Sequence, residues 1–124
     1  MQIVHRTEDD VLIIEVLEAR LATNAAQDFG EQLNHLIGLG HNRVVLNLQR
    51  VRFIDSSGLG IIVMVQRRLT NGGEIAIVSD QEAVLNVLKL TRMNKIFRIF
   101  PDEASAVAAL SEASSPNPPQ GLSG

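Results

Sequence analysis

Runs of β-branched and aliphatic residues mark a series of predicted β-strands along the chain. Residues 11–17 (VLIIEVL) follow a charged, turn-like TEDD segment, and the apolar residues 3–4 before it predict a shorter strand, so the chain opens with a hairpin. Residues 43–48 and 75–78 are short and rich in valine, isoleucine and leucine, which is typical of parallel strands buried on both faces. A last strand is predicted at 97–100.

Apolar residues recur with helical spacing between these strands. The first predicted helix starts at Asn24, a candidate N-cap, ends near Gly38 or Gly40, and buries a stripe formed by Phe29, Leu33, Leu36 and Ile37. The second, at 58–70, is apolar almost all the way round and should therefore be mostly covered. It stops at the sequence NGG, where glycine permits a left-handed turn, and the chain returns into the next strand as a βαβ unit.

Two further helices complete the pattern. Ser79 or Asp80 is a candidate cap for the third, whose inner face is Val84, Leu85 and Leu88. The fourth opens at Pro101 and Asp102 and runs to about Leu110. The alternating order predicts an α/β domain: a small mixed β-sheet that carries its helices mainly on one face.

The length of 124 residues suits one compact domain, predicted at 1–110. The remaining residues, 111–124, are rich in proline, serine and glycine and offer almost nothing to bury, so we expect a disordered tail.

Composition narrows the classes of function. The chain has no cysteine, which excludes a disulfide scaffold and a thiolate metal site, and aromatic residues are only 3%, which removes stacking platforms for single-stranded nucleic acid. A net charge of -3 does not indicate the excess of positive charge that attracts DNA or an anionic membrane. The first residues lack the pattern of a signal peptide, and no apolar run is long enough to cross a membrane. We therefore expect a cytoplasmic protein without nucleic-acid or membrane partners.

One segment gathers groups that could carry chemistry. After the strand at 43–48, the chain reads FIDSSGLG and runs into the second helix, so a carboxylate, two hydroxyls and two glycines meet at a helix N-terminus, which favours negative charge. Ser57 is the natural N-cap of that helix. Ser56, one residue earlier, is then freer and more exposed.

Four interpretations of this segment remain open on spacing. A hydrolase nucleophile would need the pattern G-x-S-x-G, and neither Ser56 nor Ser57 has glycine at both of those positions. A catalytic triad would also need a histidine that lies close to the serine in the folded protein. A dinucleotide fingerprint lacks its third glycine, because Val63 stands in that place. Ser56 could instead accept a phosphate from another protein and so expel a bound partner. Finally, the segment could be only a capped turn.

The same segment resembles the signature of the STAS domain, specifically of bacterial anti-sigma factor antagonists of the SpoIIAA and RsbV kind. The family loop reads hydrophobic, Asp, Ser, Ser/Thr/Ala, Gly, Leu, Gly, and this chain matches it from Phe53 to Gly60. The likeness extends upstream through VVLNLQRVRF and downstream through NGGE and LKLTRMNKIF, and covers roughly residues 3–110.

The resemblance implies a STAS fold and a non-enzymatic partner protein without a cofactor. It implies that Ser56 is phosphorylated by a GHKL-type serine kinase that doubles as an anti-sigma factor, that the unphosphorylated chain binds this kinase, and that a PP2C-type phosphatase resets it. The contact surface would comprise Asp55, Ser57, Gly58, Leu59 and Gly60, and the free chain is expected to be a monomer. The alternatives are a STAS module with a non-sigma target, in secretion, motility or surface growth, and a constitutive, unphosphorylated scaffold.

One departure from the family concerns the turn before the first helix. Members commonly carry a Gly-Glu-Leu-Asp-like turn there, but this chain has Ala19-Arg20-Leu21-Ala22. Both acids are replaced and a base is introduced, on a loop expected to lie near Ser56. Because this turn differs in charge from the family pattern, the chain could differ from other members in its affinity for the usual kinase or in the kinase that it binds.

Overall fold

The computed structural model describes residues 1–69 and 72–113, and its centre is a mixed sheet of five strands. Their order is β1-β2-β4-β6-β7, with β1 and β2 antiparallel and the other neighbours parallel. The strands are β1 (Ile3–Glu8), β2 (Val11–Val16), β4 (Arg43–Asn47), β6 (Glu74–Val78) and β7 (Arg98–Phe100). The predicted opening hairpin is confirmed, and its turn places Asp9 and Asp10 at positive φ, which aspartate tolerates better than most residues.

Four α-helices connect and follow these strands, as the sequence pattern predicts. They are α1 (Thr23–Ile37), α2 (Ser56–Arg68), α3 (Glu82–Leu90) and α4 (Glu103–Ala113), and a short 3-10 helix, η1 (Met93–Lys95), follows α3. The β4, α2 and β6 elements form the expected βαβ unit with parallel strands. The α1 helix ends at Ile37 with Gly38 as its C-cap, in agreement with the predicted boundary.

Two of the predicted helix caps are wrong. The α1 helix begins before Asn24 and has Ala22 at its N-cap position, with no side-chain hydrogen bond. The N-cap position of α3 is Gln81, also without a side-chain hydrogen bond, while Ser79 Oγ accepts from the backbone N–H of Gln81 at 3.1 Å. The N-cap of α1 therefore lies two residues before the predicted one, and that of α3 lies one or two residues after it.

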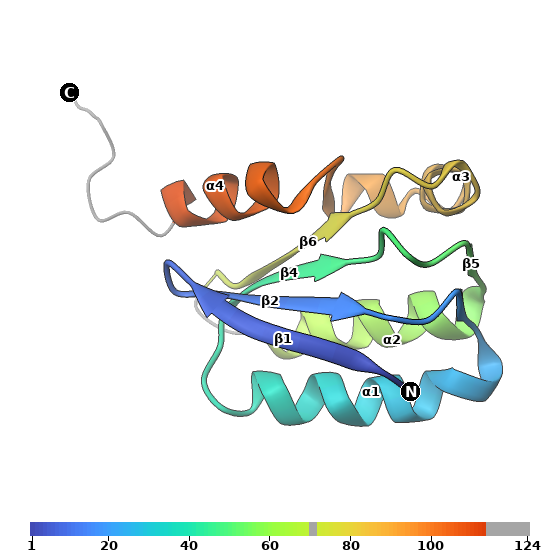
Figure 1. Ribbon diagram of the computed structural model, residues 1–124, viewed down its shortest axis with the longest axis horizontal. Helices are drawn as coiled ribbons and strands as arrows, with labels where there is room; N and C mark the ends of the chain where they lie inside the picture. Colours follow the sequence, from blue (N-terminus) through green and yellow to red (C-terminus); the bar gives the residue numbers. More distant parts are fainter. Residues whose placement is uncertain (70–71, 114–124) are drawn as a thin grey trace.

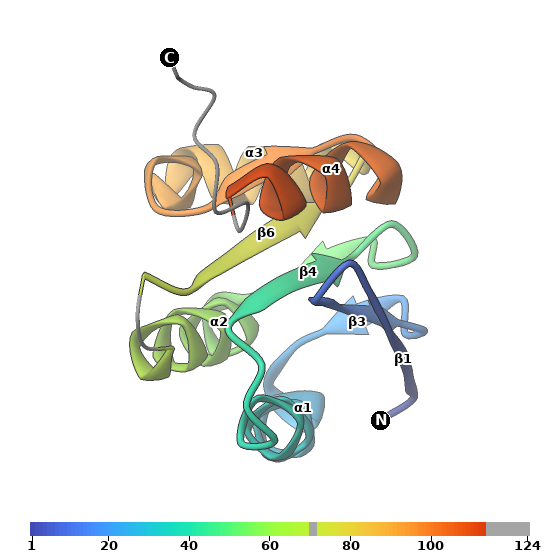
Figure 2. The same ribbon diagram turned by 90° about the vertical axis from the view of Figure 1, so that its left-hand side faces the viewer.

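The helices cover the sheet unequally. Figures 1 and 2 show α1 and α2 packed beneath the sheet, with α4 on the opposite side. The larger core lies on the α1 and α2 side and also takes in Val84 and Leu88 of α3. A smaller core joins α4 to the other face through Ala106, Val107 and Leu110. The α3 helix is drawn above the sheet with α4, so the helices are not mainly on one face, although α1, α2 and α3 all contribute to the larger core. The predicted α/β fold class with a mixed sheet is confirmed.

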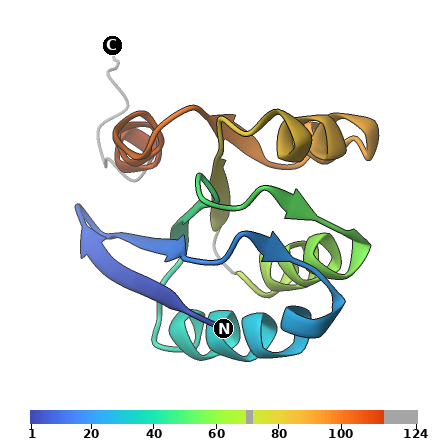
Figure 3. The same ribbon diagram turned by 45° about the vertical axis from the view of Figure 1, so that its right-hand side comes forward.

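A second, two-stranded sheet was not predicted from the sequence. It pairs β3 (Arg20–Leu21) with β5 (Phe53–Ile54) in parallel, with Arg20 opposite Phe53 and Leu21 opposite Ile54. Figure 3 shows these short arrows, blue and green, side by side next to the first turns of α1 and α2. Because each strand has two residues, neither gives a periodic pattern, yet together they hold the turn before α1 against the turn before α2.

The last helix reaches into the segment predicted to be a tail. The α4 helix ends at Ala113, so residues 111–113 belong to a helix. The remainder of the predicted tail, 114–124, lies outside the described residues, as do Thr70 and Asn71 of the turn after α2. Among the described residues, no helix is both long enough and apolar enough to span a membrane.

Candidate functional site

Asp55 organises the FIDSSGLG segment. It is the N-cap of α2, and its Oδ1 accepts hydrogen bonds from the backbone N–H of Ser57 at 2.9 Å and of Gly58 at 3.1 Å. The prediction that Ser57 caps this helix is therefore wrong. Because β5 ends at Ile54, the helix begins at Ser56, two residues earlier than predicted, and the carboxylate of Asp55 reaches its first N–H groups.

The second carboxylate oxygen of Asp55 ties α2 to α1. Its Oδ2 accepts from both the backbone N–H and the hydroxyl of Thr23, each at 3.1 Å, and the Thr23 hydroxyl lies 3.3 Å from that of Ser57. The hydrogen bond from the Gly58 N–H is the largest cause of a lowered pKa of Asp55; desolvation opposes it, and the hydrogen bonds from Thr23 and Ser57 add to the lowering. Asp55 is thus an ionised clamp between two helix N-termini at neutral pH.

The two serines have different environments. Ser56 is exposed at the first position of α2, and its side chain makes no hydrogen bond to any residue that the structure describes. Ser57 is half-buried and its hydroxyl faces Thr23. The prediction that Ser56 is the freer hydroxyl is confirmed, and Ser56 is the one that a partner could reach.

The two glycines of the segment serve different needs. A Cβ on the buried Gly58 would lie 2.5 Å from the backbone oxygen of Leu21, so only glycine lets α2 approach β3 this closely. A Cβ on the exposed Gly60 would meet no atom within 4 Å. Gly58 is therefore required by packing, whereas Gly60 leaves open surface beside Ser56.

An open groove of about 460 Å³ runs from Ser56 along α2. Met64 is 47% exposed, although the apolar pattern of this helix predicts that it is mostly covered. One apolar side of α2 therefore remains unpacked and forms the wall of a groove, which sequence reasoning missed. The lining residues are Ser56, Leu59, Gly60, Val63, Met64, Arg67 and Met93, the last of which comes from η1.

Two histidines of the chain lie away from this groove. His5 and His35 line a separate hollow between β1 and α1, so neither forms a triad with Ser56. Among the described residues, no group of three or more histidines and carboxylates could hold a metal ion. The groove beside Ser56 is lined mainly by apolar side chains, with the Ser56 hydroxyl near one end and the Arg67 guanidinium as its charged group.

Comparison with known proteins places this arrangement in a family. The STAS-domain model matches residues 2–106. The chain belongs to the STAS-domain family. A Thermotoga maritima protein with the provisional name of an anti-sigma factor antagonist is 32% identical over 97 residues, which cover 77% of this STAS-domain chain and 86% of that protein.

Solved structures of this family share the fold. An anti-sigma factor antagonist from Mycobacterium paratuberculosis has a TM-score of 0.81 at 20% identity, covering 87% of this chain and 92% of that one. SpoIIAA in its unphosphorylated form has a TM-score of 0.74 at 18% identity, covering 88% of this chain and 96% of SpoIIAA. The Bacillus SpoIIAA has also been solved phosphorylated, with a TM-score of 0.66 at 17% identity and coverage of 88% and 99%. At these identities the likeness shows the fold alone.

Proposed function

We propose that this STAS-domain protein is an anti-sigma factor antagonist that works by partner switching. In its unphosphorylated form it binds a GHKL-type serine kinase that acts as an anti-sigma factor; phosphorylation of Ser56 releases it, and a PP2C-type phosphatase restores it. The observation that carries the proposal is the position of Ser56, exposed and without a hydrogen bond at the end of an open apolar groove.

Phosphate on Ser56 would change binding through charge. It adds about -1.5 to -2 charges at neutral pH. The helix N-terminus offers little compensation, because the N–H groups of Ser57 and Gly58 already donate to Asp55 and that of Leu59 donates to the Asp55 carbonyl. The phosphate would therefore face outward beside an ionised carboxylate, and a partner covering the groove would have to desolvate both charges.

The remaining residues of the predicted contact surface fit this role. Leu59 and Gly60 line the groove directly, while Asp55, Ser57 and Gly58 hold the helix end that presents Ser56. The ATP and the phosphoryl-transfer machinery would belong to the kinase. We propose that the chain itself is a non-enzymatic switch.

Mapping the phosphorylated residue tests the proposal. The chain would be incubated with ATP and the GHKL-type kinase whose gene lies nearest to its own, and the modified residue would be identified by mass spectrometry. Wild type and Ser57→Ala should each gain one phosphate, and Ser56→Ala none, because Ser56 is exposed beside the groove whereas Ser57 is half-buried with its hydroxyl facing Thr23. Equal modification of Ser56→Ala and wild type would refute the assignment.

A second candidate is a STAS module with a non-sigma target. The basic β3 segment favours it, because Arg20 stands where members of the family commonly carry acidic residues. A kinase complex that forms and dissociates without affecting any sigma factor would point to this second function.

A further inference from the structure

A cation is held against an exposed aromatic ring beside the proposed switch. Arg20 of β3 lies directly opposite Phe53 of β5, and its guanidinium carbon is 4.3 Å from the centre of the Phe53 ring. Phe53 is 40% exposed, so the stacked pair faces solvent. Stacking orders the arginine side chain and leaves guanidinium N–H groups free to donate to a planar anion.

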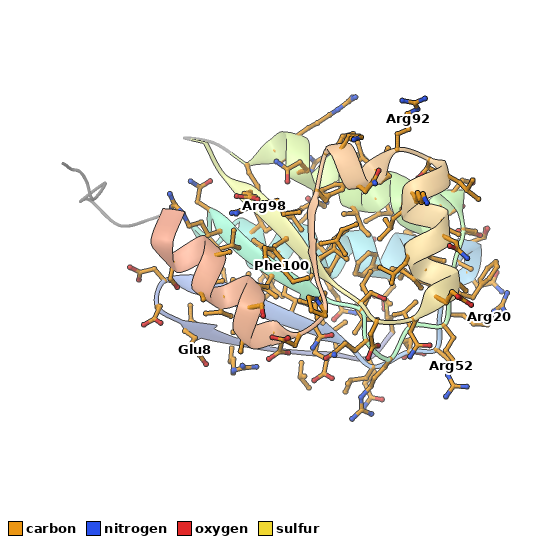
Figure 4. All side chains as sticks on the ribbon, turned by 90° about the horizontal axis from the view of Figure 1, so that it is seen from above. Glu8, Arg20, Arg52, Arg92, Arg98 and Phe100 are labelled. Atoms are coloured by element: carbon orange, nitrogen blue, oxygen red, sulfur yellow. The ribbon has the colours of Figure 1, made fainter. Side chains whose placement is uncertain are left out.

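The positive charge of this pair is not neutralised. Among the described residues, Arg6, Arg50 and Arg98 each have a carboxylate partner, but neither Arg20 nor its neighbour Arg52 forms an ion pair. The backbone N–H of Arg52 donates to the carbonyl of Ala19, which brings the two arginine positions together. Figure 4 shows Arg20 and Arg52 projecting at one end of the molecule, away from Glu8 and Arg98.

Two carboxylates near Arg20 in the sequence or in the hollow, Glu18 and Asp55, accept hydrogen bonds from other donors and do not pair with it. Glu18 accepts a hydrogen bond from the backbone N–H of Gln2. Each oxygen of Asp55 accepts two hydrogen bonds, from Ser57 and Gly58 or from Thr23. Within the part of the chain that the structure describes, Arg20 and Arg52 therefore stay without a carboxylate partner, and two guanidinium charges stand beside the single negative charge of Asp55.

Arg20 borders a hollow that adjoins the Ser56 groove. Arg20, Phe53 and Asp55 line the hollow, which has a volume of about 390 Å³ and continues over the first residues of α1. Ser56, the next residue after Asp55, lines the groove along α2. A partner that covers Ser56 is therefore in reach of Arg20.

We propose that the Arg20–Phe53 hollow docks an acidic side chain of the partner kinase and thereby selects which kinase binds. The inference rests on the proposed function and adds the chemistry of the partner's contact surface: a carboxylate meeting the stacked guanidinium. Two arginines beside a carboxylate are too few for the polybasic clusters that attract anionic lipids or the phosphates of nucleic acid. Charge complementarity therefore favours an acidic protein segment.

Charge reversal at Arg20 tests the inference. The unphosphorylated wild type, Arg20→Glu and Arg68→Glu would be titrated against the same GHKL-type kinase, and their Kd values compared at increasing salt. Arg68 is an exposed residue about 18 Å along α2 from Ser56, so its variant matches the change in net charge at a distant place. We expect Arg20→Glu to raise Kd by about tenfold or more and to weaken its salt dependence, and Arg68→Glu to change Kd by less than about twofold.

The other possible results distinguish a failure of the docking inference from a failure of the proposed function. If wild type binds and Arg20→Glu binds equally well, the docking inference fails while the proposed function stands. Equal losses for Arg20→Glu and Arg68→Glu would show a general charge effect and also overturn it. Binding of wild type to phosphatidylglycerol vesicles that Arg20→Glu abolishes, with kinase binding unchanged, would assign the surface to lipid instead. If wild type does not bind the kinase at all, the proposed function itself fails, and the inference with it.

Discussion

At the scale of single residues, neighbours in the FIDSSGLG segment have separate tasks. Asp55 holds two helices together, Ser57 joins that hydrogen-bond cluster, and Ser56 stays free. Sequence reasoning found Ser56 because an exposed hydroxyl beside a capped helix end is visible in the local pattern. It assigned the cap to Ser57 because the start of α2 is set by the end of β5, a two-residue strand paired with the distant β3, which no local pattern reports.

The two glycines of α2 provide a residue-scale prediction. Alanine stabilises a helix by about 1 kcal/mol relative to glycine, so helix propensity alone would raise the unfolding free energy of both Gly58→Ala and Gly60→Ala. Only Gly58→Ala meets the Leu21 backbone oxygen, so we expect it to lose about 1 to 3 kcal/mol of unfolding free energy, and Gly60→Ala to lose none. Urea unfolding of both variants measures this. A Gly58→Ala protein as stable as Gly60→Ala would contradict the close approach of α2 to β3.

At the scale of elements, the pattern of apolar residues predicts the main strands and helices but not how they meet. The β3 and β5 strands have two residues each, so they give no period to detect. The apolar excess of α2 predicts cover on every side, whereas Met64 remains 47% exposed and the groove lies beside it. Both features concern contacts between distant segments, and both shape the candidate site.

The attachment of α4 provides an element-scale prediction. Glu103 accepts from Asn47 Nδ2 at 2.6 Å and from Arg6 at 2.9 Å, joining α4 to β4 and β1. Desolvation raises the pKa of Glu103, but the hydrogen bonds from Asn47 and Arg6 and the charge of Arg6 outweigh it, so the pKa falls below its ordinary 4.5. This carboxylate therefore stabilises the fold above that value, and the contribution disappears as pH falls through the lowered pKa.

Replacing Glu103 by glutamine tests this attachment. Glu103→Gln keeps the shape but removes the charge, so we expect a loss of about 1 kcal/mol of unfolding free energy at neutral pH and a shallower loss of stability in acid. Glu8→Gln is the matched control, because Glu8 lies 3.6 Å from the same Arg6 and both side chains are more than half exposed. Urea titrations across the acid range measure the difference. Equal stabilities of the two variants would show that Glu103 does not anchor α4.

At the scale of the whole molecule, the proposed switch lies beside two hollows of the surface. Ser56 lines the groove along α2 and its neighbour Asp55 lines the hollow beside Arg20, so the proposed phosphorylation site lies between the two. Phosphorylation would alter that surface without breaking any hydrogen bond of the Asp55 cluster, since the Ser56 side chain takes part in none of them. The account therefore predicts a change in affinity without a change in fold.

The most direct test compares the affinity of the kinase for the two forms of the chain. Unphosphorylated protein and protein phosphorylated on Ser56 would be titrated against the same GHKL-type kinase by calorimetry, with circular dichroism to verify that both are folded. We expect phosphorylation to raise Kd by about a hundredfold or more, because the partner would have to cover the phosphate beside Asp55. Equal Kd values for the two folded forms would contradict a phosphorylation-controlled switch.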